Sequence, residues 1–124
     1  MRTAALALAI HAVPAPALAV AVDSESARFQ EDARRLEKTG DLDGAAIQLK
    51  NAIRADRANA QARFELAQIH LRRGDPAAAV KELRAAREAG FDAGRLAVPL
   101  ARAHLQAGEH AEVLAVEVPA GLDA

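Results

Sequence analysis

Small and apolar residues recur every three to four positions along most of the chain, which is the spacing of one face of an α-helix. The segment from Ser24 to Thr39 carries Phe29, Ala33 and Leu36 on such a face. Each pair of consecutive periodic segments predicts a helical hairpin. The further segments are 42–53, 60–73, 77–89, 94–107 and a short one that begins near His110.

A glycine followed by an acidic residue separates the two segments of each pair. These dipeptides are Gly40-Asp41, Gly74-Asp75 and Gly108-Glu109. Glycine accepts the positive φ that often ends a helix, and an aspartate side chain can cap the next one. Pro76 suits the first turn of its helix, whereas Pro119 cuts the last helix short. The chain is therefore predicted to be all-α, with tandem antiparallel hairpins stacked on one another.

The sequence matches itself at a step of 34 residues. The three dipeptides above lie one such step apart, and many other positions coincide at the same offset. Self-similarity at a fixed period is typical of a helical repeat array. We predict repeats at about 26–59, 60–93 and 94–124, the last of them incomplete. The coinciding residues are Ala33, Ala67 and Ala101; Leu66 and Leu100; His70 and His104; Leu71 and Leu105; Ala45 and Ala79; Leu49 and Leu83; and Ala52 and Ala86.

This pattern resembles the tetratricopeptide repeat (TPR), a helix–turn–helix unit with the same period. The resemblance covers about residues 24–115 and implies a short right-handed solenoid of about two and a half repeats. The third unit departs from the pattern, because Val113 and Glu117 stand where alanine and leucine are expected. The second unit carries the pattern most fully, through Leu66-Ala67, His70, Gly74-Asp75, Ala79, Leu83 and Ala86.

Three strings show a narrower similarity, to the opening repeats of long TPR proteins that accompany exosortase/PEP-CTERM sorting and exopolysaccharide production. They are residues 40–53, 74–90 and 100–114. The similarity implies a scaffold role in such a system. Those proteins are far longer, which leaves open that this chain is a piece of a longer array.

Residues 1–21 have the layout of a secretory signal peptide, with a charged start, an apolar middle and small residues before a cleavage site. Arg2 supplies the charge, and residues 4–10 form an apolar run that is too short to span a bilayer. Cleavage is expected after Ala19 or Ala21, which predicts a periplasmic or secreted protein. The alternative is a disordered, alanine-rich leader ahead of a repeat domain at 22–124.

Composition narrows the class of protein further. The 124 residues include 34 alanines and only three aromatic residues, which favours closely packed helices over a sheet. A net charge of -1 gives no basic excess for nucleic acid. The absence of cysteine excludes disulfides, thiolate metal sites and a cysteine nucleophile.

The resemblance implies a partner-binding surface, because in this family the first helix of each unit lines the concave face. On this chain the face carries five basic residues and no acid, with Glu37 beside it. Arginine forks bind carboxylates bidentately, so we expect a protein or extended peptide with acidic groups. The alternative is a solvated surface without a ligand. The predicted partner-binding residues are Gln30, Arg34, Lys38, Gln61, Phe64, Gln68, Arg72, Arg95, Val98, Arg102 and Gln106.

No constellation of residues predicts an enzyme. His70 and His104 stand where the family packs an aromatic residue, and we expect both at the edge of the core. His110 completes no ligand spacing comparable to HExxH. The glycines are spaced as turn residues and hydroxyls are few, so we expect no catalytic residue, cofactor or metal.

The C-terminal segment is apolar, whereas a repeat array normally ends in a polar capping helix. Leu105, Val113, Leu114 and Val116 are expected to lack a covering partner. An exposed apolar end is an association site. The alternative function is therefore that of an assembly piece that associates with itself through this end.

Overall fold

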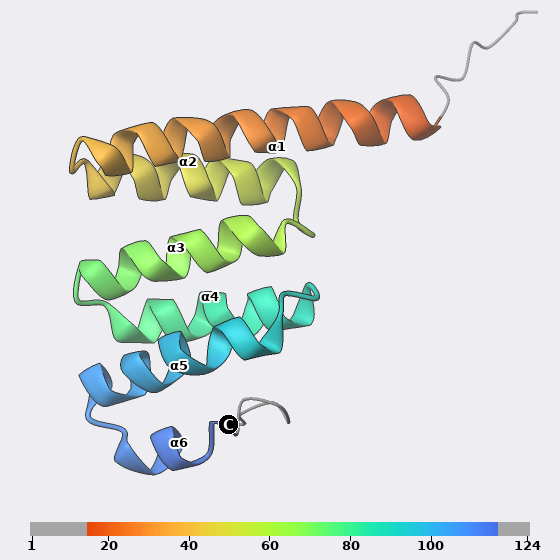
Figure 1. Ribbon diagram of the computed structural model, residues 1–124. Helices are drawn as coiled ribbons and strands as arrows, with labels where there is room; N and C mark the ends of the chain where they lie inside the picture. Colours follow the sequence, from red (N-terminus) through yellow and green to blue (C-terminus); the bar gives the residue numbers. More distant parts are fainter. Residues whose placement is uncertain (1–14, 117–124) are drawn as a thin grey trace, which may run out of the picture.

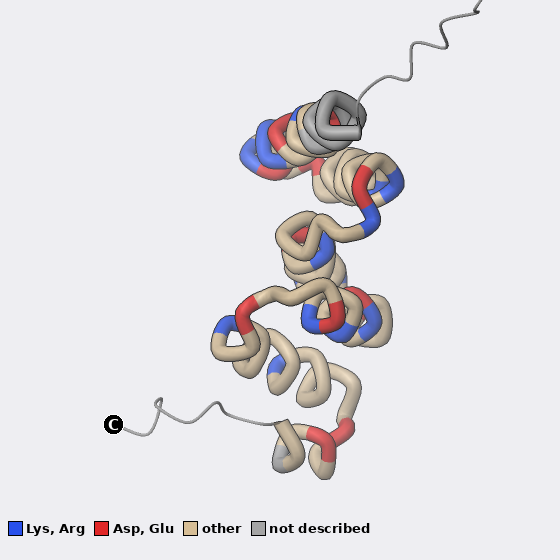
Figure 2. The backbone as a smooth tube through the Cα atoms, turned by 90° about the vertical axis from the view of Figure 1, so that its right-hand side faces the viewer, with Lys and Arg blue, Asp and Glu red and all other residues tan. Residues whose placement is uncertain are grey.

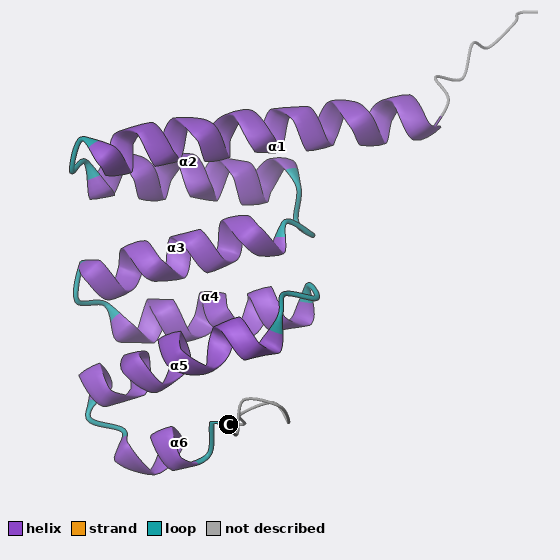
Figure 3. Ribbon diagram, in the orientation of Figure 1, coloured by secondary structure: helices purple, strands orange, loops and turns teal. Residues whose placement is uncertain are grey.

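The computed structural model describes residues 15–116, without the side chains of residues 15–23 and Leu114. Within this range the backbone forms six helices joined by short turns, and no strand (Figures 1 and 3). The all-α prediction is therefore confirmed. The helices are α1 (Ala15–Lys38), α2 (Leu42–Ala55), α3 (Ala60–Arg72), α4 (Pro76–Glu88), α5 (Ala93–Ala107) and α6 (His110–Leu114).

Consecutive helices pack against each other as antiparallel pairs, and the pairs stack in chain order (Figure 1). The pairs are α1 with α2, α3 with α4, and α5 with α6. Each helix lies beside its neighbours in sequence, as expected when one hairpin cannot bury its apolar face alone. The arrangement is a short helical solenoid of the TPR type.

The predicted turns adopt the geometry that their residues favour. Gly40 and Gly74 have φ of 84° and 74°, in the left-handed region where a side chain is strained. Asp41 then accepts a hydrogen bond from the backbone N–H of Gly44 at 2.8 Å. Asp75 accepts one from Ala78 at 3.1 Å. Both aspartates thus satisfy N–H groups that the start of a helix leaves free.

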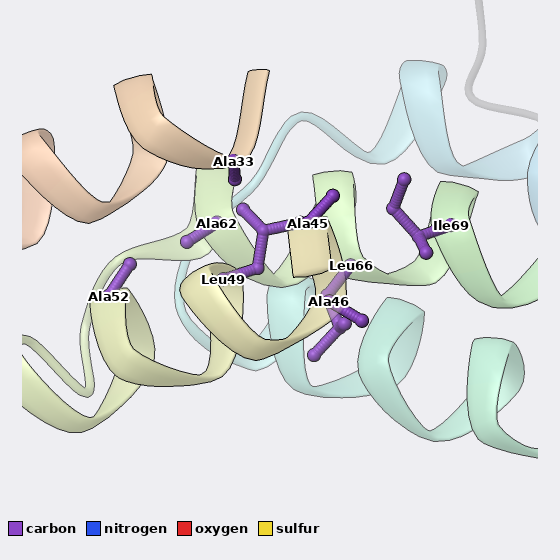
Figure 4. Packing of buried hydrophobic residues seen from close by; sticks show 8 residues of the cluster. All are labelled: Ala33, Ala45, Ala46, Leu49, Ala52, Ala62, Leu66 and Ile69. Atoms are coloured by element: carbon purple, nitrogen blue, oxygen red, sulfur yellow. The ribbon is translucent and has the colours of Figure 1, made fainter. Parts of the chain in front are cut away.

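The core consists of two clusters in which leucines lie among small alanines. In the first cluster, Leu49, Leu66 and Ile69 are each no more than 2% exposed. Figure 4 shows them with the alanines of the same cluster, with Leu49 near Ala45 and Leu66 near Ala46. The second cluster joins α3, α4 and α5 around residues that include Leu83 and Leu96. Small side chains let the helix backbones approach closely, so an alanine-rich chain still builds a packed interior.

The first helix is longer than predicted. It begins at Ala15 rather than Ser24, so the expected start was wrong. The added segment is rich in alanine and leucine, and Pro16 is tolerated because it lies in the first turn. Figure 1 shows this segment projecting beyond α2.

The predicted leader falls partly outside the described residues. Residues 1–14 are not described, and the proposed cleavage positions Ala19 and Ala21 lie within α1. The signal peptide stays a prediction. None of the helices in the described range is both long and apolar enough to cross a membrane.

Candidate protein-interaction surfaces

The eleven predicted partner-binding residues lie on the first helix of each hairpin. We call their surface the A-helix face. Two of them, Gln30 and Phe64, are buried, so the accessible face is formed by the other nine. The helix α1 carries Gln30, Arg34 and Lys38; α3 carries Gln61, Phe64, Gln68 and Arg72; and α5 carries Arg95, Val98, Arg102 and Gln106.

The buried members of this set hold the repeats together. The Phe64 ring stacks on Phe91, with 4.4 Å between ring centroids. The Arg95 guanidinium lies 5.3 Å from the centroid of Phe64 and 4.9 Å from that of Phe91. Gln30 accepts a hydrogen bond from Asn59 at 2.7 Å. Phe64 and Gln30 therefore have structural roles, and Arg95 is partly engaged by the two rings.

An acid that the sequence analysis did not include lies within the A-helix face. Glu65 on α3 accepts a hydrogen bond from Arg34 on α1 at 2.8 Å and one from Gln61 at 2.9 Å. The hydrogen bond to Glu65 and its negative charge raise the pKa of Arg34 above its ordinary value. The spacing from Gln61 to Glu65 was visible in the sequence, whereas the contact across 31 residues was not.

A second acid neutralises another predicted cation. Glu37 on α1 accepts a hydrogen bond from Arg72 on α3 at 2.5 Å. Figure 2 shows this interleaving, with acidic positions beside basic ones along α1. Of the five predicted cations, Lys38 and Arg102 have neither an acidic nor an aromatic partner within residues 15–116. These two are the cations best placed to meet a carboxylate of a partner.

The repeat aligns polar residues across the three first helices in two rows. The first row is Arg34, Gln68 and Arg102, and the second is Lys38, Arg72 and Gln106, each with a step of 34 residues. All six are exposed or half-buried. Because equivalent positions of stacked repeats face the same way, the rows form one polar, basic surface across the solenoid.

The end of the solenoid at α5 exposes apolar side chains. Val98 is 76% exposed and Leu105 is 54% exposed. Their equivalents one repeat earlier, Phe64 and Leu71, are 8% and 4% exposed. The difference arises because no further hairpin follows α5 and α6 within the described range. We call Val98, Ala101 and Leu105 the open stripe.

A groove lies beside this end, between α4, α5 and α6. Its volume is about 540 Å³, and we call it the terminal groove. Buried residues of α5, including Leu96 and Ala97, line it together with the half-buried Leu100 and Val116. It is mostly apolar and recessed, so it suits side chains from a protein more than a charged metabolite.

The two repeat-equivalent histidines are buried, as predicted, but their environments differ. His70 is 7% exposed, and its Nδ1 has no hydrogen-bond partner among the residues that the structure describes. Burial is the main cause that lowers the pKa of His70. In the third hairpin, His104 Nδ1 lies 2.7 Å from Glu109 Oε2, and Glu109 forms no capping bond to α6. Among the described residues, no group of three or more His, Asp or Glu side chains could hold a metal ion.

Comparison with known families agrees with this architecture. A tetratricopeptide repeat family model matches residues 36–98, which is just over half of the chain. The chain belongs to the tetratricopeptide repeat family. That family is generally a non-catalytic interaction repeat, which indicates a module that binds other proteins. A comparison with curated proteins found no match.

Proposed function

We propose that this chain is a non-catalytic TPR module that binds a protein or extended peptide with acidic side chains along its A-helix face. The main support for the proposal is that two rows of polar residues run across α1, α3 and α5. Lys38 and Arg102 lie in different rows and are exposed without an acidic neighbour in the described range. A carboxylate of the partner would gain charge-assisted hydrogen bonds there.

The cations that are already paired with acids limit how tightly this surface can bind an acidic partner. Arg34 and Arg72 already bond to Glu65 and Glu37. An acidic partner would compete with these internal acids for Arg34 and Arg72, whereas no acid of residues 15–116 competes with it for Lys38 and Arg102. Exposed charge pairs contribute little affinity each, so several contacts along an extended segment are needed.

We also propose that the protein is exported and acts as a scaffold in an exosortase/PEP-CTERM or exopolysaccharide system. The layout of residues 1–21 and the similarity of three repeat strings support this proposal. N-terminal sequencing of the protein recovered from a periplasmic fraction tests the export step. A chain that starts at Val20 or Val22 is expected, and an intact Met1 in the cytoplasmic fraction would contradict it.

Affinity capture from an envelope extract tests the A-helix face. The full chain is compared with a Lys38→Glu/Arg102→Glu variant and with a matched control, Lys50→Glu/Lys81→Glu. The control reverses two exposed charges on α2 and α4. We expect a partner that the full chain and the control retain and the first variant loses. Equal retention by all three would overturn the proposal.

A second candidate function is self-association through the apolar C-terminal end. The 76% and 54% exposure of Val98 and Leu105 favours it, together with the half-buried Val113 and Val116. Sedimentation over a wide concentration range tests it against a Val98→Lys/Leu105→Lys variant. Dimers formed by the full chain and lost in this variant would support the candidate, and a strict monomer would exclude it.

A further inference from the structure

The second helix of the third hairpin is much shorter than its two equivalents. It has five residues, whereas α2 has 14 and α4 has 13. At the repeat step, Glu117 corresponds to Leu83 and Pro119 to Ala85. Leu83 is fully buried, so a carboxylate at its position would lose its hydration. A proline inside the helix would remove a hydrogen bond and clash with the preceding turn. The chain's own sequence therefore opposes completion of this helix.

The terminal groove lies beside the short α6, in the part of the third hairpin that corresponds to the region covered by α4 in the second hairpin. In the second hairpin, Arg63 on α3 forms an ion pair with Glu82 on α4 at 3.3 Å. Their side chains are only 21% and 16% exposed, because α4 lies over this part of α3. The equivalents in the third hairpin are Ala97 and Val116, and both line the groove. The groove thus corresponds to space that a second helix covers in the preceding repeat.

The chain itself shows which side chains fill this position. The helices α2 and α4 share one buried pattern. It consists of a small residue, a leucine four positions later and another small residue three positions after the leucine. Each of these six residues is no more than 2% exposed. The small residues permit close approach of the backbones, and the leucine fills the space between helices. The series are Ala45, Leu49 and Ala52 in α2, and Ala79, Leu83 and Ala86 in α4.

The two rims of the groove carry opposite charges. Arg84 lies on the α4 side and Glu112 on the α6 side, and both are exposed. A helix in the groove would be oriented by an acid facing Arg84 and a base facing Glu112, since complementary charges favour one orientation over its reverse.

We propose that the terminal groove binds an amphipathic helix of another protein, which completes the third hairpin from outside. The helix has a Leu-x-x-Ala stripe about two turns long, an acidic side toward α4 and a basic side toward α6. The α2 and α4 helices of a second copy cannot serve, because their stripes are buried in their own hairpins. This binding site is separate from the A-helix face.

The probe is a fluorescein-labelled peptide with the sequence of residues 75–90, which contains the α4 stripe and its aspartate cap. Fluorescence anisotropy measures its binding to the full chain. The matched control peptide carries Leu83→Glu and keeps the length and the cap. We expect the control peptide to bind at least tenfold more weakly, because its carboxylate would enter an apolar groove. Equal binding of the two peptides would overturn the proposal.

Two variants of the full chain test whether the probe binds in the terminal groove. Leu100→Glu puts a charge in the groove wall and should weaken binding at least tenfold, with circular dichroism melting as the check on folding. Glu117→Leu/Pro119→Ala lets the chain complete its own helix. It should raise the melting temperature and block the peptide. Binding of the peptide to both variants with unchanged affinity would overturn the proposal.

The controls separate this inference from the other proposals. Leu105→Glu changes the open stripe, and Lys38→Glu/Arg102→Glu changes the A-helix face. Chains with either change should bind the probe with the affinity of the full chain. Loss of binding in either variant would overturn the assignment to the groove. One other occupant of the groove is the start of α1 from a second copy of the chain. This alternative is tested by comparing the sedimentation of the full chain with that of a chain that begins at Val22. Self-association that depends on residues 15–21 and is blocked by Glu117→Leu/Pro119→Ala would assign the groove to that segment and overturn the proposal.

Discussion

Asn59 donates a hydrogen bond from its side-chain amide to the Ser26 hydroxyl at 2.8 Å, across the junction of the first two hairpins. Ser26 is 1% exposed and donates in turn to the carbonyl of Ala52 at 2.9 Å. The same Asn59 amide donates to Gln30, and its oxygen accepts from the N–H of Ala62 at 2.8 Å. One side chain thus caps α3 and connects it to α1 and, through Ser26, to α2.

Removing this side chain should destabilise the stack of hairpins. Asn59→Ala loses the helix cap, worth about 1 kcal/mol, and leaves buried partners unsatisfied, so we expect a loss of about 2–3 kcal/mol. Asn59→Ser keeps a capping oxygen, so its stability should lie between that of the native chain and that of Asn59→Ala. Urea unfolding followed by circular dichroism measures the difference. Three indistinguishable midpoints would show that the junction does not depend on this residue.

The ion pair of Arg34 with Glu65 should contribute a small coupling energy between the first and second repeats. The Arg34 side chain is 47% exposed and that of Glu65 is 18% exposed, so solvent screens the interaction. A double-mutant cycle with Arg34→Ala and Glu65→Ala is expected to give about 0.5–1 kcal/mol. The coupling should fall in 1 M salt, where the Debye length is about 3 Å. Strictly additive effects at low salt would contradict this role.

Stability should fall on acidification because of His70. Burial is the main cause that lowers its pKa below the ordinary 6.5; Lys50 and Arg73 lower it further, whereas Asp75 and Glu82 raise it. The unfolded chain therefore binds more protons than the folded chain as the pH drops below 6.5.

The contribution of His70 to the free energy of unfolding is thus fully present at neutral pH and is lost as the pH falls toward the folded-state pKa. We expect the slope of stability against pH between 6.5 and the folded-state pKa to be smaller in a His70→Leu chain, which has no titrating group at this position. Thermal melts at a series of pH values between about 7 and 5 measure both slopes. Identical slopes would contradict the assignment to His70.

Gly74 should resist replacement for a conformational reason alone. Its φ is 74°, and a Cβ built on it would meet nothing within 4 Å. Gly74→Ala is therefore expected to cost about 1–2 kcal/mol of backbone strain, with a smaller loss for Gly74→Asn. Equal stability of the glycine and alanine chains in thermal melts would show that the turn relaxes to another conformation.

The helices and turns could be predicted because they follow from local rules. The period of small and apolar residues marks each helix, and the Gly-Asp dipeptides mark the first two turns. The short α6 was also foreseeable, since Pro119 opposes a longer helix. The start of α1 was missed because the prediction began at Ser24, although the alanine-rich segment before it also favours a helix.

The contacts that define the candidate site could not be predicted in the same way. Arg34 and Glu65, or Asn59 and Ser26, are about 30 residues apart in the chain, and only the stacking of hairpins brings them together. As a result, the sequence indicated a basic face with Glu37 as the one acid beside it, and not the acid Glu65 within it. The structure adds Glu65 to this face. Of its five predicted cations, only Lys38 and Arg102 have no acidic or aromatic partner within residues 15–116.

Site-specific photo-cross-linking tests the central proposal most directly, namely that a partner binds the A-helix face. A photoreactive phenylalanine analogue replaces Gln68, in the middle of the first polar row, or Lys81, which is exposed on α4. Each chain is irradiated in an envelope extract. We expect a discrete cross-linked protein at Gln68 that is absent at Lys81 and is lost when Lys38→Glu/Arg102→Glu is added. A cross-link at Lys81 with none at Gln68 would contradict it.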